Sequence, residues 1–184
     1  MAPKLIGLCG LAGSGKSTAA DHLVSRHHFR RLRFASPIKR MIRCLLIEAG
    51  AGLMEAVEMV DGNLKETPTD LLGGKSPRYA MQTIGTEWGR DLIATDIWRK
   101  ILLSKVSRHL NEGHSVVVDD LRFENEAEAL KQAGFTIISV KRPGIAGVQA
   151  HSSEAQVLTF ERILLNNGPV EKLHADLDLF LSES

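Results

Sequence analysis

The amino-acid sequence predicts an α/β fold in which a parallel β-sheet is covered by helices on both faces. Two observations carry this prediction. Short apolar runs of the kind found in buried strands alternate with longer segments of helical periodicity. The first apolar run also leads directly into a glycine-rich turn, GLAGSGKST at 10–18, and then into a helix. The 184 residues suit one compact domain, and an apolar share of 43% is ordinary for a globular protein.

The chain is expected to begin with a strand, a helix and a second strand. Residues 4–10 form a continuous apolar run that ends at a glycine, as buried parallel strands do. The following helix at 14–27 places Ala19 and Leu23 on one side. Residues 29–35 then alternate between polar and apolar, which indicates a half-buried strand.

Three further helices are expected in the next part of the chain, at 36–50, 77–90 and 96–111. The first has Ser36 as its N-cap and Pro37 at its first helical position, where the missing N–H of proline costs no intrahelical hydrogen bond. The last carries Trp98 and Leu102 on a core-facing stripe that continues at four-residue intervals. Residues 62–77 are rich in turn-forming residues and are expected to form a loop.

The remaining sequence continues the alternation. The expected elements are a strand at 115–120, a helix at 123–134, a strand at 135–142, a loop at 143–154, a strand within 157–167 and a helix at 168–181. The run SVVVDD at 115–120 is typical of a strand buried on both faces, and Gly134 ends the helix that follows it.

Composition argues against several classes of protein. The net charge is +1, whereas proteins that wrap nucleic acid carry a clear basic excess, so no stable binding to nucleic acid is expected. No apolar run reaches the ~18 residues that span a bilayer. The apolar N-terminal stretch is short and leads directly into the glycine-rich turn, so we do not interpret it as an export signal. Cys9 and Cys44 form neither a disulfide framework nor a zinc-ligand pattern. We therefore expect a cytoplasmic protein that binds no membrane.

The glycine-rich turn has the spacing of a phosphate-binding loop. Gly10, Gly15, Lys16 and Ser17 satisfy the pattern G-x-x-x-x-G-K-[ST], between an expected strand and an expected helix. Glycines allow the backbone N–H groups to point inward, and the helix N-terminus adds partial positive charge. In such loops the lysine reaches the β- and γ-phosphates, and the hydroxyl after it binds Mg²⁺.

An acidic pair supplies a candidate for the second part of the metal site. Asp119 and Asp120 end the strand at 115–120, and a phosphate-binding loop needs an acidic residue at a neighbouring strand end. Adjacent strand residues point to opposite sides, so only one is expected to face the metal, and we favour Asp120. The alternative is an acidic pair that caps the following helix.

A kinase needs a second cationic pocket for its acceptor, which a hydrolysing switch does not. Residues 26–43 contain seven basic residues and no acidic one. Lys39 and Arg40 follow FASP and are the best placed to meet an anion, although a solvated basic face is an equally good interpretation. We expect Arg30 and Arg31 to lie on such a solvated face.

Further cations and polar residues recur in two places. On a helix at 77–90, Arg78 and Gln82 lie one turn apart and Arg90 ends the run, so the three are candidates to hold a phosphate and a base edge. The alternative is an ordinary amphipathic helix. Arg122 and Arg142 follow strand ends, where cations can close over a transferring phosphoryl group. A loop that also carries His151 and Glu154 could act as a lid that excludes water.

Together these segments resemble the phage-type deoxynucleoside monophosphate kinases, a branch of the P-loop nucleotide kinases. The matching segments are GLAGSGKSTAADHL, FASPIKRM, RYAMQTIGTEWGRDL followed by DIWRK, VVVDDLRFENEAEAL, SVKRPG, HSSEA and NNGPVEKL. The resemblance implies a three-layer α/β/α sandwich with a five-stranded parallel sheet. It implies one P-loop kinase domain over 1–184, with an acceptor-binding helical region at about 36–112 and a lid loop at about 142–156.

The resemblance also implies a reaction and a set of site residues. The reaction is transfer of the γ-phosphoryl group of ATP to a deoxynucleoside 5′-monophosphate with Mg²⁺. The implied catalytic residues are Lys16, Asp120, Arg122 and Arg142, and the implied metal ligands are Ser17 and Asp120. The implied ATP-binding residues are Gly10, Ala12, Gly13, Ser14, Gly15, Lys16, Ser17, Thr18, Asn167 and Gly168. The implied acceptor-binding residues are Lys39, Arg40, Arg78, Gln82, Arg90 and Trp98.

Three other functions stay open on the sequence alone. One is a kinase of the same fold that acts on another small acceptor, such as a nucleoside, dephospho-coenzyme A or a phosphorylated metabolite. Another is a nucleotide-dependent switch, although NNG at 166–168 is not the base-reading motif of a GTPase. A kinase that modifies a base within DNA is disfavoured by the near-neutral charge. A homodimer is slightly favoured over a monomer.

Overall fold

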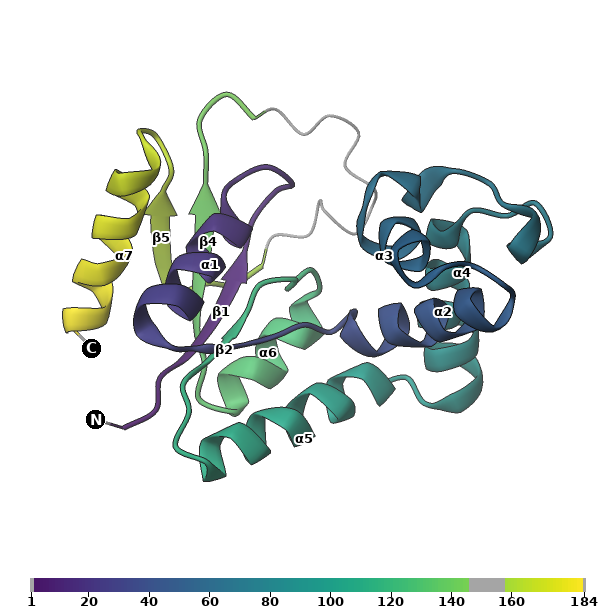
Figure 1. Cartoon of the computed structure of the whole chain (residues 1–184). Helices are drawn as coiled ribbons and strands as arrows, with labels where there is room; N and C mark the ends of the chain where they lie inside the picture. The colour runs from purple at the N-terminus through teal and green to yellow at the C-terminus, as the bar shows by residue number, and fades with distance from the viewer. Residues whose placement is uncertain (1, 146–157, 184) are drawn as a thin grey trace. The chain divides into compact units, whose positions relative to one another are not determined.

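The chain divides into two compact units (Figure 1). The computed structural model describes residues 2–145 and 158–183. Residues 1–33 and 102–184 form one unit, which we call the sheet unit, and residues 34–101 form the other, which we call the helical unit. Among the described residues, no helix is both long enough and apolar enough to cross a bilayer.

All five strands of the sheet unit run parallel, in the order β2-β3-β1-β4-β5. The strands are β1 (Leu5–Cys9), β2 (Arg30–Leu32), β3 (Val116–Val118), β4 (Thr136–Lys141) and β5 (Arg162–Leu165). The register places Ile6 of β1 beside Val117 of β3 and Thr136 of β4. Because the strands point the same way, the residues that follow them lie at one edge of the sheet, here named the C-terminal edge. The predicted parallel sheet of five strands is confirmed.

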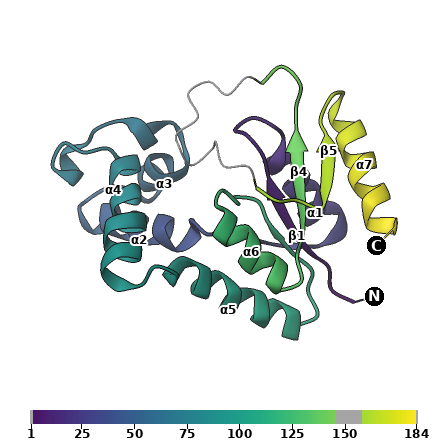
Figure 2. The same ribbon diagram turned by 180° about the vertical axis from the view of Figure 1, so that it is seen from behind.

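Helices cover both faces of this sheet (Figures 1 and 2). Helices α1 (Lys16–His27) and α7 (Val170–Glu183) lie on one face, and α6 (Glu124–Gln132) lies on the other. Helix α5 (Ile97–Asn111) begins in the helical unit and ends in the sheet unit. The three layers follow from strands whose successive side chains point to opposite faces, both of them apolar.

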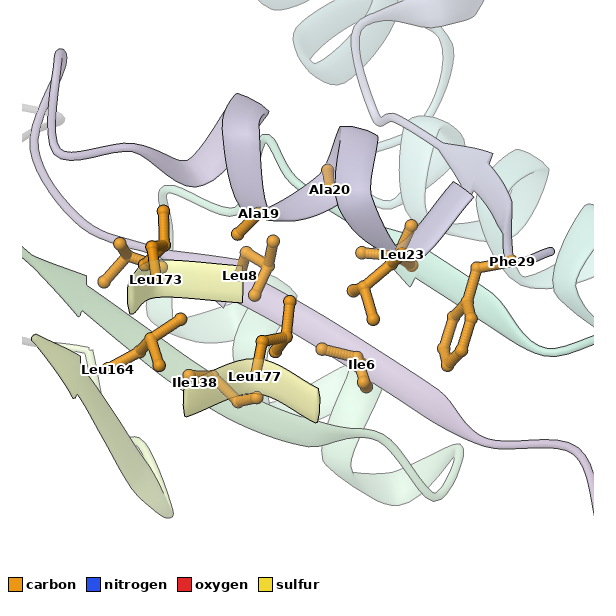
Figure 3. Close-up of a cluster of buried hydrophobic side chains, with 12 residues drawn as sticks. Ile6, Leu8, Ala19, Ala20, Leu23, Phe29, Ile138, Leu164, Leu173 and Leu177 are labelled. Carbon is orange, nitrogen blue, oxygen red and sulfur yellow. The ribbon is translucent and has the colours of Figure 1, made fainter. Parts of the chain in front are cut away.

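The main core lies between the sheet and the α1–α7 layer (Figure 3). Its buried residues are Ile6, Leu8, Ala19, Ala20, Leu23, Phe29, Val117, Ile138, Val140, Leu164, Leu173 and Leu177. Between Ile6 and Leu8, Gly7 faces the opposite layer, where a Cβ would come within 3.4 Å of Leu130 in α6 and within 2.6 Å of Ile137 in β4. Strand β1 is thus buried on both of its faces, as its continuous apolar run predicts.

The helical unit is built from helices of three types. They are α2 (Ser36–Glu48), α3 (Leu53–Asp61), the 3₁₀ helices η1 (Asn63–Glu66) and η2 (Asp70–Leu72), α4 (Pro77–Thr83) and the π-helix η3 (Ile84–Ile93). Helices α2 and α3 share a core that consists of Ile42, Leu46, Ala51, Ala56, Met59 and Val60. Leu71, Leu72, Ala80, Met81 and Ile84 pack against it.

Three local predictions for this unit differ from the structure. Ser36 is the first residue of α2 and Ala35 is its N-cap, so the proline occupies the first turn one position later than expected. Helix α3 is not among the predicted elements. The stretch 62–77 holds η1, η2 and an antiparallel bridge between Thr69 and Lys75, so it is more ordered than a simple loop.

The helix expected at 77–90 changes from α to π geometry at Ile84 because of a close contact with Trp98. The Trp98 indole N–H donates to the Gly85 carbonyl oxygen at 2.7 Å, and the buried ring lies against Gly89. A Cβ at Gly89 would approach the ring atom Cε2 to 2.7 Å. The wider π turn therefore accommodates the indole beside Gly89, which has no side chain. The Ala94 N–H donates to the Gly89 carbonyl oxygen five residues back, as in a π-helix.

Replacing Gly89 with Ala should destabilise the protein because the new methyl group would overlap the Trp98 ring. We expect the free energy of unfolding to fall by about 2 kcal/mol, as for an overpacked core. The matched control is Gly52→Ala, where nothing lies within 4 Å of the added Cβ. Urea unfolding followed by circular dichroism measures both. Equal stabilities of the two variants would contradict the packing described for η3.

Candidate active site

The loop between β1 and α1 is a closely packed backbone turn at the C-terminal edge of the sheet. Gly10, Gly13 and Gly15 have φ angles of 138°, 76° and 107°, which L side chains rarely adopt. A Cβ at Gly10 would collide with the carbonyl oxygen of Val140, at the end of β4. A Cβ at Gly15 would come within 2.5 Å of the Asn166 side-chain nitrogen. The glycine pattern is therefore required both by the turn and by its neighbours.

Asn166 anchors this loop from the end of β5. Its side-chain amide donates to the Ser14 carbonyl oxygen at 2.9 Å, and its backbone N–H donates to the Lys141 carbonyl oxygen at 2.7 Å. Asn166 thus supports the loop, and it is not among the predicted site residues. From the NNG segment the prediction took only Asn167 and Gly168, both of which are exposed. The signal in the sequence is the NNG segment directly after a strand that ends at the same edge.

The side chains of the loop differ in their surroundings. The Lys16 ammonium donates to the carbonyl oxygens of Gly10 and Leu11 at 2.6 and 2.7 Å. The Ser14 side chain is buried at 2% exposure, and its hydroxyl has no hydrogen-bond partner among the described residues. A buried hydroxyl of this kind needs a partner other than the described residues, such as an ordered water or a ligand atom. Ser17, in the first turn of α1, is exposed.

The remaining predicted loop residues lie around this turn. Ala12 and Gly13 are exposed at its tip, and Thr18 is half-buried in the first turn of α1. The turn leads directly into the N-terminus of α1 at Lys16, where the first backbone N–H groups of a helix have no intrahelical partner.

Asp119 is a buried carboxylate held by two arginines, Arg31 in β2 and Arg33 directly after this strand. It accepts hydrogen bonds from the Arg33 side chain at 2.6 and 2.8 Å and from Arg31. Burial alone would raise the pKa of Asp119, but the hydrogen bonds from Arg33 and Arg31 outweigh it and lower the pKa below its ordinary value. Arg31 also bonds Asp21 at 2.5 Å, so the prediction that Arg31 lies on a solvated basic face is wrong.

Asp120 and Arg122 follow on a segment that Glu126 holds in place. The buried Glu126 carboxylate accepts the backbone N–H groups of Arg122 and Phe123 at 3.2 and 3.3 Å. Asp120 is half-buried, and the Arg122 side chain is exposed. Arg142 is exposed directly after β4, at the same edge. His151, Glu154 and most of the expected lid loop lie outside the described residues.

In the helical unit, two predicted acceptor residues belong to one cationic cluster. Lys39 pairs with Asp61 at 2.6 Å, and Arg78 pairs with Glu66 at 2.7 Å. Lys65, which the sequence analysis did not single out, is near both: partial burial and the charges of Arg78 and Lys39 lower its pKa. We call Lys39, Lys65 and Arg78 the cationic cluster. Asp61 and Glu66 partly offset the repulsion among these three cations.

The other predicted acceptor residues have varied surroundings. Arg40 is exposed on α2, Gln82 is exposed on α4, and Arg90 is half-buried in η3. Trp98 is buried at 4% exposure, and its indole N–H donates to the Gly85 carbonyl oxygen. It therefore has a place in the core, and its contact with an acceptor stays a prediction.

Comparison with known proteins identifies the family. The family description "Deoxynucleotide monophosphate kinase" matches residues 74–177. A protein of Acanthamoeba polyphaga mimivirus, whose name assigns it provisionally to that activity, is 32% identical over 190 residues, which cover 94% of this chain and 93% of the viral protein. The chain belongs to the deoxynucleotide monophosphate kinase family. The deoxynucleotide monophosphate kinase of Enterobacteria phage T4 is 22% identical over 233 residues, which cover 95% of this chain and 97% of the phage protein.

A likeness to solved structures extends over both units of this kinase. Dephospho-CoA kinase from Campylobacter jejuni superimposes with a TM-score of 0.54 and 12% identity, covering 97% of this chain and 96% of that chain. At such low identity the likeness shows the fold alone. The predicted three-layer kinase fold and the predicted membership of the phage-type kinases are both confirmed.

Replacing Asp119 with Asn should destabilise the protein in a pH-dependent way, because it removes the charge that two guanidinium groups surround. We expect a loss of about 3 kcal/mol in the free energy of unfolding at pH 7. The folded pKa of Asp119 is lowered, so its contribution is present above the unfolded carboxyl pKa and is lost as the pH falls through the folded value. The difference from the wild type should therefore shrink below about pH 4.

Asp21→Asn is the matched control, since Asp21 pairs with the same arginine but is exposed. It should change the stability by less than about 1 kcal/mol. Urea unfolding from pH 7 to pH 3 measures both variants. A difference between wild type and Asp119→Asn that stays constant across this range would argue against the paired carboxylate.

Proposed function

We propose that this kinase transfers the γ-phosphoryl group of ATP to a deoxynucleoside 5′-monophosphate, with Mg²⁺ on the donor phosphates. The observation that carries the proposal is the loop after β1. It combines three left-handed glycines, a lysine at the start of α1 and the buried Ser14 hydroxyl without a partner among the described residues. Backbone N–H groups, a cation and a hydroxyl at a helix N-terminus are the donors that a triphosphate needs. The family supplies the class of acceptor.

On the donor side, the residues of the loop would hold the phosphates of ATP. Lys16, which now donates to two loop carbonyls, would bind the β- and γ-phosphate oxygens. Residues 10–18 would enclose the phosphates, and Asn167 and Gly168 would lie beside the adenine. Asn166 would keep the loop at the end of β5 while the nucleotide binds and leaves.

The magnesium ligands fit the residues at the C-terminal edge. Ser17 is exposed in the first turn of α1, and Asp120 is the second residue after the end of β3 at Val118. We assign the metal to Asp120 because both oxygens of Asp119 accept hydrogen bonds from Arg31 and Arg33. When bound, Mg²⁺ neutralises charge on the donor phosphates.

Cations at the same edge would stabilise the group in transfer. Arg122 and Arg142 are exposed after β3 and β4 and can approach a phosphoryl group held by the loop. The acceptor is largely a dianion at pH 7, so its oxygen is already a nucleophile and needs no strong general base. The chief obstacle is repulsion between two anions, which positive charge and alignment overcome.

On the acceptor side, the cationic cluster is the proposed site for the monophosphate. A phosphate dianion could replace Asp61 and Glu66 as the partner of Lys39 and Arg78, and it would favour the charged form of Lys65. Arg40, Gln82 and Arg90 are proposed to contact the rest of the nucleotide. Trp98 would act as a positioning residue, because it fixes the turn of η3 that carries Arg90.

The proposed reaction is tested by measuring ADP release with a panel of acceptors. Deoxynucleoside monophosphates should stimulate ADP release strongly, and only in the presence of Mg²⁺. Ribonucleoside monophosphates, nucleosides and dephospho-coenzyme A are the comparison acceptors. Stimulation by one of the last two alone would identify a kinase for another small acceptor, and slow release that no acceptor changes would identify a switch. Either result would refute the proposal.

Replacing Lys16 with Ala should lower kcat by about a thousandfold, because one cation at the transferring phosphates is lost. The melting temperature should be unchanged within a few degrees. Lys100→Ala is the control, since the exposed Lys100 side chain pairs with Asp96 at 3.0 Å, and its kcat should equal that of the wild type. Steady-state kinetics with saturating acceptor measures the effect. Near-normal turnover by Lys16→Ala would remove the loop from the mechanism.

Replacing Arg78 or Lys65 with Ala should raise the KM for the monophosphate by about tenfold or more, because a charge-assisted hydrogen bond to the phosphate is lost. The KM for ATP should stay within about twofold of the wild-type value. Lys75→Ala is the control within the same unit, because its ammonium lies over the Tyr79 ring, 5.2 Å from the centroid. If both KM values rose equally, the cationic cluster would not be the acceptor site.

A further inference from the structure

Two histidines of α1 and one aspartate of α7 converge on a single point in the sheet unit. The Nε2 atoms of His22 and His27 both lie 2.6 Å from the same carboxylate oxygen, Oδ1 of Asp178. The possible ligand atoms of the three residues all lie within 4.8 Å of one another. The proposed phosphoryl transfer uses none of these residues.

The rings approach this point from different directions. The imidazoles of His22 and His27 are 5.5 Å apart between centroids and inclined by 73°. His174, one turn before Asp178 on α7, stacks on His22 at 4.0 Å with the planes only 13° apart. This stack holds the His22 ring in the plane that aims Nε2 at the carboxylate. Two imidazole nitrogens and a carboxylate oxygen are the ligand types of a tetrahedral ion. At 2.6 Å the nitrogens now hydrogen-bond the carboxylate oxygen, so an ion would replace these bonds and move the ligand atoms apart to about 3.3 Å.

The helices that carry these residues are fixed by the core beneath them (Figure 3). Leu173 and Leu177 of α7 are buried in the same cluster as Leu23 of α1, and each is a direct neighbour in sequence of His174 or Asp178. The backbone positions of the three residues are therefore set before any ion binds. The Asp178 side chain is 43% exposed, against 11% for His22, so solvent can reach the point where the ligands meet.

We propose that His22, His27 and Asp178 bind a divalent transition-metal ion of the Zn²⁺ type, which joins α1 to α7. Imidazole nitrogen with one carboxylate suits Zn²⁺ and similar ions, whereas Mg²⁺ and Ca²⁺ prefer oxygen ligands. Water would occupy the remaining position on the solvent side. The site differs in its residues and its ion from the magnesium site of the proposed reaction, and it does not depend on that reaction. Because α1 begins at Lys16, the ion would brace the helix that starts at the phosphate-binding loop.

A second group of histidines provides a comparison within the same chain. His109, Glu112 and His114 also place their ligand atoms within 4.8 Å of one another. These three lie within six positions at the end of α5, and Glu112 is exposed. An ion there would connect no second helix, so we expect little effect of Zn²⁺ on stability through this group.

The test uses the full chain, freed of metal with a chelator and then titrated with Zn²⁺. Calorimetry should show a tight site, and the melting temperature should rise with Zn²⁺ because only the folded chain presents the three ligands together. Asp178→Asn and His27→Asn should each weaken this site by at least about tenfold and abolish the rise in melting temperature. His28→Asn is the matched control: His28 is exposed, adjacent to His27, and in a left-handed conformation that Asn tolerates.

A cooperative thermal unfolding transition of each variant in the presence of chelator establishes that the variant is folded without metal. Co²⁺ bound to the wild-type protein gives a spectroscopic readout that does not depend on any variant. Tetrahedral Co²⁺ should produce strong visible absorption that one equivalent of Zn²⁺ removes. The proposal is overturned if Zn²⁺ does not raise the wild-type melting temperature. It is also overturned if Asp178→Asn and His27→Asn bind Zn²⁺ as the wild type does while His109→Asn does not.

Discussion

The close approach of the glycine loop to the ends of β4 and β5 is the constraint on which the rest of the structure depends. No side chain fits at Gly10 because the Val140 carbonyl occupies that space, and one at Gly15 would be strained by the φ of 107° and would displace the Asn166 amide. The loop therefore lies against the C-terminal edge of the sheet, and α1 must start at Lys16. A parallel sheet brings the ends of its five strands to the same edge, so the acidic and basic residues that follow them share one region.

Electrostatics divides the acidic pair at this edge into two roles. Asp119 is buried and keeps its charge because Arg31 and Arg33 surround it, which ties the end of β2 to the end of β3. The next residue, Asp120, is half-buried and is the one proposed for the metal. In the helical unit, Lys39, Lys65 and Arg78 lie close enough to repel one another, and Asp61 and Glu66 pair with two of them. The proposed transfer between two phosphates would require a carboxylate for the metal and cations for the acceptor anion.

The sequence alone predicted the features that depend on local pattern. The parallel strands, the loop with its glycines and the buried stripe through Leu102 follow from periodicity and spacing, and the structure has them. It did not predict the π-helix η3, because that geometry arises from packing between Gly89 and Trp98. The roles of Arg31, Lys65 and Asn166 were missed for the same reason: each depends on a partner distant in sequence or in another element.

The fate of the γ-phosphoryl group tests the central claim most directly. The measurement follows ³²P from γ-labelled ATP during turnover with a deoxynucleoside monophosphate and Mg²⁺. The account predicts that the label appears in the deoxynucleoside diphosphate, one equivalent for each ADP formed. Label that appears only as inorganic phosphate, at the same rate with and without the acceptor, would contradict it.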